Sequence, residues 1–117
     1  MPATDATARF FDRLAERGHE PLLQKASGCM QFEIVDGGRT RRWRVTVDKG
    51  AVAVEPGGGA ADCAIRAERR LFERIVTGRA NAVAAVLRGD VAVQGDWRLL
   101  VAMQRLFTGP PRRKARA

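Results

Sequence analysis

Residues 87–97 read LRGDVAVQGDW, and this stretch is the most specific fold marker in the sequence. Two Gly-Asp pairs enclose a short run, VAVQ, in which valines alternate with alanine and glutamine. Glycine after an apolar helical pattern is typical of a helix end, and alternation is typical of a half-buried strand. The stretch therefore predicts that a helix ends at Gly89, that a strand follows, and that Asp96 caps a further helix after Gly95.

Residues 88–90 also spell Arg-Gly-Asp, a tripeptide known as an adhesion ligand. The first residues of the chain include Asp5 and lack the apolar run of a secretion signal. Because Gly89 is needed as a helix stop and a strand begins directly after Asp90, we interpret the tripeptide as incidental. We expect a cytoplasmic protein.

In the second half of the chain, two helices are predicted before the strand of this stretch and one after it. The first carries an apolar stripe of Leu71, Phe72, Ile75 and Val76 and ends at Gly78. The second covers residues 81–88, and we expect Asn81 to cap it and its valines and Leu87 to pack inward. The third is Trp97–Phe107.

Earlier in the chain the apolar period is two. Residues 29–35, 41–47 and 51–55 alternate apolar and polar side chains and are joined by glycine-containing turns, which predicts an antiparallel meander. Its polar face is expected to bring Glu33 near Arg42 or Arg44, because neighbouring strands place such pairs within reach. Residues 62–67 form a predicted fourth strand.

A first helix is predicted from a cap at Thr4 or Asp5 to about Arg17, with Gly18 as its stop. Its apolar stripe contains Phe10, Phe11, Leu14 and Ala15. The sheet has one apolar face, and the helices have apolar stripes that need covering. We therefore predict an α+β fold: a five-stranded, mainly antiparallel sheet covered on one face by four or five helices.

With 117 residues, the chain has the length of one domain. We assign residues 1–109 to this domain and residues 110–117 to a basic tail after Pro110-Pro111. The tail holds four of the 21 basic residues, so half of the net charge of +8 belongs to it. Such charge favours weak attraction to anionic surfaces, including membranes. A specific nucleic-acid site is disfavoured, because no set of stacking aromatics accompanies the arginines.

The composition also argues against catalysis and metal binding. The chain has one histidine, His19, and two cysteines, Cys29 and Cys63, without a CxxC pair. Zinc sites need four such ligands at short spacings, so we expect no metal and no cofactor, and we interpret both cysteines as small hydrophobic residues on strands. There is no GxSxG motif and no phosphate loop. We therefore expect a protein that is not an enzyme.

The predicted helix Trp97–Phe107 is more apolar than a helix on a sheet requires, with only Arg98, Gln104 and Arg105 polar. Two interpretations stay open. The helix is either a core helix covered on most sides, or it faces a lipid, a membrane or a second subunit.

The order of elements from residue 61 to 107 resembles the sterol carrier protein type 2 family of nonspecific lipid carriers. The family pattern is a strand opening with Asp, a helix closing at Gly, a short helix, Gly, a short apolar strand, Gly-Asp and an apolar helix. The matching residues are Asp62, Gly78, Gly89, Gly95 and Asp96. Eukaryotic members often end in a peroxisomal tripeptide, whereas this sequence ends in Ala-Arg-Ala. We therefore expect a stand-alone, bacterial-type, cytoplasmic member.

The resemblance implies a hydrophobic tunnel between sheet and helices that takes a fatty acid, an acyl chain or a sterol-like lipid, with binding and transfer as the function. Inward residues would line the tunnel: Trp43, Val45, Phe72, Ile75, Leu87, Val93, Leu100, Met103 and Phe107. The alternative is an interaction module with a closed cavity, which forms a homodimer or binds an enzyme of a lipid pathway.

Overall fold

The computed structural model describes residues 6–107, apart from the side chains of Arg105 and Phe107. The predicted cap at Thr4 or Asp5 and the basic tail at 110–117 lie outside this part. The elements, in chain order, are α1 (Ala6–Arg17), the 3₁₀ turn η2 (Pro21–Leu23), β1 (Ser27–Asp36), β2 (Arg39–Asp48), β3 (Ala51–Pro56), β4 (Cys63–Glu68), α2 (Arg69–Val76), α3 (Ala82–Leu87), β5 (Ala92–Gly95) and α4 (Trp97–Phe107).

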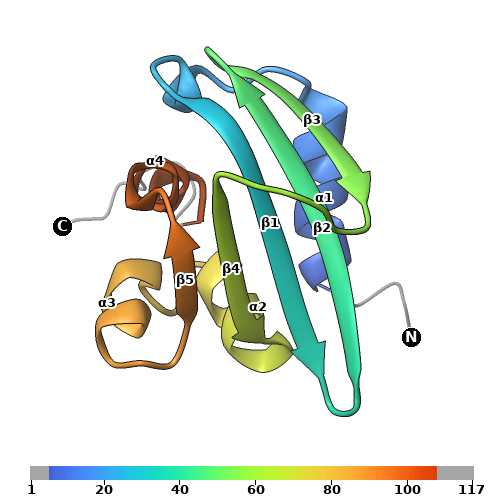
Figure 1. Ribbon diagram of the computed structural model, residues 1–117, viewed down its shortest axis with the longest axis vertical. Helices are drawn as coiled ribbons and strands as arrows, with labels where there is room; N and C mark the ends of the chain where they lie inside the picture. The colour runs from blue at the N-terminus through green and yellow to red at the C-terminus, as the bar shows by residue number, and fades with distance from the viewer. Residues whose placement is uncertain (1–5, 108–117) are drawn as a thin grey trace, which may run out of the picture.

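The five strands form one sheet in the order β3-β2-β1-β4-β5 (Figure 1). Strands β1, β2 and β3 are the predicted antiparallel meander, which is confirmed, and β5 pairs antiparallel with β4. Strand β4 runs parallel to β1, so the sheet is mixed although mostly antiparallel. The parallel pair arises because the chain crosses from the β3 edge to the far side of β1 before it starts β4.

The crossing segment lies on the polar face of the sheet. The backbone N–H of Gly59 donates to Gln31 Oε1 at 2.7 Å, which fixes the loop over β1. Asp62, just before β4, then joins three segments. Its carboxylate accepts from the Cys29 N–H at 2.8 Å, and its carbonyl accepts from the Asp96 N–H at 2.8 Å. Asp62 thus connects the starts of β1 and β4 to the start of α4.

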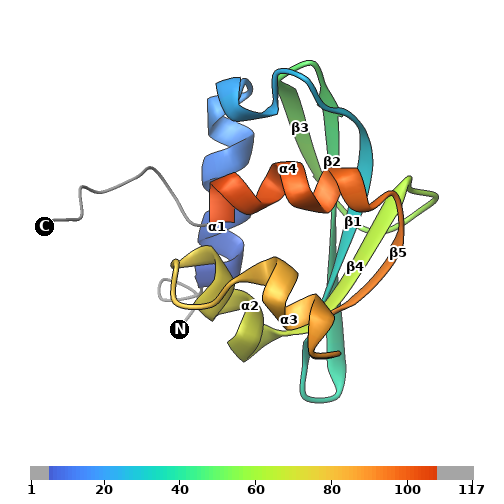
Figure 2. The same ribbon diagram turned by 90° about the vertical axis from the view of Figure 1, so that its left-hand side faces the viewer.

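The helices cover the other face of the sheet (Figure 2). Helix α1 ends at Gly18 with a positive φ of 64°, as predicted from the sequence. Helix α3 begins at the predicted cap, because Asn81 Oδ1 accepts from the Ala84 N–H at 2.8 Å. None of the helices in residues 6–107 has the length and apolarity needed to span a bilayer.

The stretch 87–97 folds as the two Gly-Asp pairs predict. Gly89 follows α3 with a φ of 85°, and Gly95 ends β5 with a φ of 101°, both in the left-handed region that favours glycine. Asp96 then caps α4, since its Oδ1 accepts from the Arg98 N–H at 2.9 Å. Residues Trp97–Phe107 are helical with the predicted bounds.

An aromatic cluster fills the core beside α1. Phe11 stacks on Trp43 with a centroid distance of 4.5 Å and on Phe72 at 5.7 Å. Phe32 meets Phe11 edge-on at 5.2 Å. The rings belong to α1, β1, β2 and α2, so the cluster joins both layers and holds α1 on the sheet.

Helix α3 differs from its prediction. Its buried residues are Ala82 and Ala85, and Val83 and Val86 are only half-buried. The side chain of Leu87 is 78% exposed, so the expectation that it faces inward is wrong. The helix has six residues, and its core face is defined by positions three apart. Leu87, two positions after Ala85, falls on the opposite side.

The outer, polar face of the sheet carries the predicted pair of Glu33 with Arg42, and it also carries Cys29. Glu33 accepts from Arg42 at 3.2 Å and also from Arg66 at 3.1 Å. Burial raises the pKa of Glu33, but these hydrogen bonds lower it by more, so the pKa lies below its ordinary value.

Cys29 shares this face and is half-buried, with Arg44 Nε 2.9 Å from its sulfur. Strand alternation places Cys29 on the polar face beside Arg44, which corrects its interpretation as a small hydrophobic residue.

The two thiols are expected to react very differently with a thiol reagent such as Ellman's reagent. Cys63 is fully buried, and burial followed by the charges of Asp96 and Asp62 raises its pKa to about 11. Only the thiolate is nucleophilic, so at pH 8 we expect one equivalent of native protein thiol, Cys29, to react. The second equivalent appears in denaturant. A Cys29→Ser variant with no native reactivity is the control, and two equally fast native thiols would contradict the assignment.

Candidate functional site

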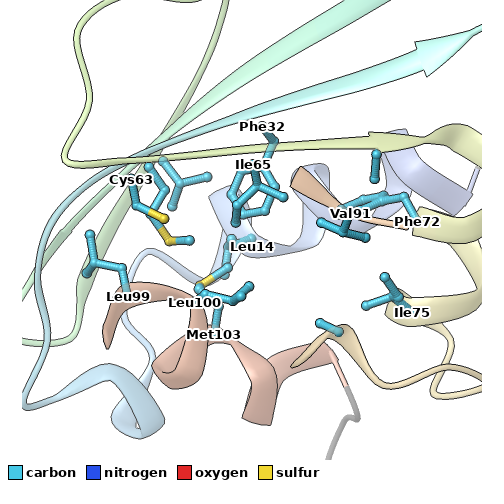
Figure 3. Close-up of a cluster of buried hydrophobic side chains, with 14 of the residues drawn as sticks. Leu14, Phe32, Cys63, Ile65, Phe72, Ile75, Val91, Leu99, Leu100 and Met103 are labelled. Atoms are coloured by element: carbon cyan, nitrogen blue, oxygen red, sulfur yellow. The ribbon is translucent and has the colours of Figure 1, made fainter. Parts of the chain in front are cut away.

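Most residues predicted to line a tunnel meet between the layers. Val45, Phe72, Ile75, Leu100 and Met103 are buried, and Trp43 and Val93 are half-buried against the same core. Figure 3 shows Ile65 and Phe32 from the sheet pointing toward Leu100 and Met103 of α4, with Phe72 and Ile75 of α2 at the other end of the cluster. Leu87 points away from it, and the side chain of Phe107 lies outside the described part.

The burial of helix α4 distinguishes between the two interpretations of its apolar sequence. Leu99, Leu100 and Met103 are buried on the sheet side. Trp97 is 40% exposed and Val101 is 54% exposed, so the helix is not covered on all sides. Other apolar residues of α4 line two surface hollows. Leu106 lines the first hollow, and Val101 and Ala102 line the second.

The first hollow, here called the α1 groove, lies along α1 and holds about 420 Å³. Its apolar lining comes from three helices and the 3₁₀ turn: Phe10, Leu14, Leu22, Val76 and Leu106. Leu14 belongs to the buried core and Phe10 packs edge-on against Phe72 at 6.0 Å, so the floor of the groove is continuous with the core. A volume of this size lies within the range of small-molecule sites.

A row of arginines forms the rim of the α1 groove. Arg9, Arg13 and Arg17 line it at spacings of four residues, which places them on one face of α1 over about 12 Å. Arg17 is 2.6 Å from the carboxylate of the buried Glu20. Within the described part of the chain, Arg9 and Arg13 have no ion-pair partner. These two guanidinium groups are therefore available to an anionic group at the mouth of the groove.

The second hollow, here called the η2 hollow, lies between η2 and the first half of α4 and holds about 490 Å³. Its walls include Leu22, Lys25, Leu99 and Val101. Asp96 and Arg98 also line it, but they bind each other at 3.0 Å. The hydrogen bonds from Arg98 hold the pKa of Asp96 below its ordinary value.

This arrangement is suited to binding an amphipathic molecule. An apolar floor can remove a hydrocarbon chain from water, and the guanidinium groups of Arg9 and Arg13 can pair with an acidic headgroup. In residues 6–107, no three His, Cys, Asp or Glu side chains are placed to hold a metal ion. The arginine row was not predicted from the sequence, although its i, i+4, i+8 spacing beside the apolar stripe of α1 is a readable signal.

The chain is similar to known proteins in sequence. The model of the SCP-2 sterol transfer family matches residues 8–108. A relative from Bos taurus, "Sterol carrier protein 2", is 29% identical over 105 residues, which cover 87% of this chain and 19% of the bovine protein. The chain thus spans about a fifth of the length of that relative.

Solved structures share the fold. The sterol carrier protein domain 2 of Helicoverpa armigera is 20% identical with a TM-score of 0.75, over 97% of this chain and 96% of that chain. The sterol carrier protein 2 of Aedes aegypti, solved in complex with palmitate, is 19% identical with a TM-score of 0.68, over 87% of this chain and 94% of that chain. These likenesses establish a common architecture.

Proposed function

This chain belongs to the SCP-2 sterol transfer family, and we propose that it binds a single-chain lipid with an acidic headgroup, such as a fatty acid, without catalysing a reaction on it. The observation that carries the proposal is the α1 groove, in which an apolar floor is bordered by Arg9 and Arg13, two arginines without an ion-pair partner in residues 6–107. The palmitate bound by the mosquito protein of the same fold supports this class of ligand.

In this proposal the carboxylate lies at Arg9 and Arg13, and the acyl chain lies over Phe10 and Leu14. Residues predicted to line a tunnel, such as Phe72 and Met103, belong to the buried core beneath the floor of the groove. Each methylene group removed from water stabilises the complex by about 0.8 kcal/mol, so the chain supplies most of the affinity. Release to a second membrane would make the protein a carrier, and its excess of basic residues favours collection at an anionic surface.

The direct test is binding of a fluorescent sixteen-carbon fatty acid, together with mass spectrometry of lipids that copurify with the protein. We expect saturable binding that unlabelled palmitate displaces. If the probe does not bind saturably and no acyl compound copurifies, the proposal is wrong. The interaction-module alternative would then be preferred and tested by light scattering for a homodimer.

The headgroup assignment is tested with the double variant Arg9→Gln, Arg13→Gln. We expect it to bind palmitate about fivefold more weakly, because exposed charge pairs contribute about 0.2–1 kcal/mol each. Its affinity for hexadecanol, which has no charge, should not change. The wild-type affinity for palmitate should also fall with added salt.

The matched control removes the same charge from exposed positions outside the groove, Arg70→Gln and Arg79→Gln. An equal loss of palmitate affinity in both double variants would show that net charge matters and that the α1 rim does not bind the headgroup.

A further inference from the structure

Leu22 lines both the α1 groove and the η2 hollow. Its side chain is 43% exposed, whereas the next residue, Leu23, is 1% exposed and belongs to the core. Two neighbouring leucines of one 3₁₀ turn thus have opposite roles. Leu23 anchors the turn, and Leu22 projects between two hollows.

The backbone of this turn is held in place from several sides. Glu20 caps it by accepting from the Leu22 N–H at 3.1 Å, and its own N–H donates to the Gly50 carbonyl at 2.7 Å. Glu20 also pairs with Arg17 at the end of α1. With the backbone fixed in this way, only the exposed side chain of Leu22 is free to turn, a motion that takes picoseconds to nanoseconds for exposed residues.

The two hollows are neighbours along α4. Leu106 contributes to the α1 groove, and Ala102, four residues earlier, contributes to the η2 hollow. Four residues of an α-helix span about 6 Å, so the hollows are about one helical turn apart. Leu22 is the residue, among those described, that both share. It therefore stands at the point where one would open into the other.

We propose that Leu22 is a movable partition that sets the chain-length preference of the site, and that the η2 hollow takes the far end of acyl chains too long for the α1 groove. The inference rests on the proposed function and adds a second subsite to it. Asp96 and Arg98 neutralise each other, and beside them and Lys25 the hollow offers the methyl end an apolar wall of Leu99 and Val101.

The test is a series of saturated fatty acids from about eight to about twenty carbons, measured by calorimetry against wild type, Leu22→Trp and Leu22→Ala. Each buried methylene tightens binding about fourfold, so affinity rises with length until the site is full. We expect Leu22→Trp to block the passage. Its affinity should level off at a shorter chain than that of wild type, so that the ratio of its affinities for the longest and the shortest acids falls at least about tenfold.

Leu22→Ala gives a second readout, which does not depend on how well tryptophan is tolerated. Because Leu22 also lines the α1 groove, the readout is the ratio of the affinities for the longest and the shortest acids. This ratio should rise about threefold over wild type, since no side chain has to be displaced. Leu87→Trp is the matched control, because it adds the same ring at a 78% exposed position outside both hollows.

The outcomes separate the two proposals. If wild type binds fatty acids but all Leu22 variants keep the same length profile, the partition is wrong and the proposed function stands. If wild type binds no fatty acid of any length, the proposed function itself fails.

Discussion

Phe11→Ala is expected to lower the free energy of unfolding by about 3–5 kcal/mol, the usual cost of removing a buried aromatic ring. Phe11 is 1% exposed, and its ring stacks between Trp43 and Phe72. Removing it deletes contacts to α2 and to the sheet at once, and leaves a cavity that the surrounding rings fill only in part. Because Phe11 anchors α1 to the sheet, we expect the α1 groove to lose its shape before the sheet unfolds.

The measurement is urea unfolding followed by circular dichroism, with fluorescence of Trp43 and Trp97 as a second probe. Leu87→Ala is the control, because a side chain that is 78% exposed contributes little, and its variant should unfold within about 0.5 kcal/mol of wild type. A Phe11→Ala loss below about 1 kcal/mol would mean that the aromatic cluster does not hold the helical layer.

Gly95→Ala is the second change with a large expected effect, of at least about 3 kcal/mol. A Cβ at this position would overlap the carbonyl oxygen of Asp62, which already accepts the Asp96 N–H at 2.8 Å. The φ of 101° adds strain for any residue with a Cβ. Since Asp62 and Asp96 join β4 to α4, the backbone cannot shift without loosening that junction.

The matched comparison is Gly89→Ala in the same stretch. Gly89 also has a positive φ, of 85°, but a Cβ there meets nothing within 4 Å. Its variant therefore reports the conformational strain alone, about 1–2 kcal/mol. In thermal unfolding, the melting temperature of Gly95→Ala should lie well below that of Gly89→Ala. Equal losses of melting temperature would show that the close approach to Asp62 is not important.

The local elements were predictable because their signals are local. The alternation of residues 29–35 and 41–47, the stops at Gly18 and Gly89 and the caps at Asn81 and Asp96 each depend on a few neighbouring residues. The number of strands, the meander and the single covered face follow from these periods.

The elements, their order and the apolar faces that must meet could therefore be predicted from the residues alone, because backbone conformation and side-chain period are properties of short segments. The folded protein was needed to see that β4 runs parallel to β1, that Leu87 faces outward, and that Arg9 and Arg13 border an apolar groove. These outcomes depend on which surfaces remain after packing. That is a property of contacts between segments far apart in the chain, such as α1, η2 and α4, and no short pattern encodes it.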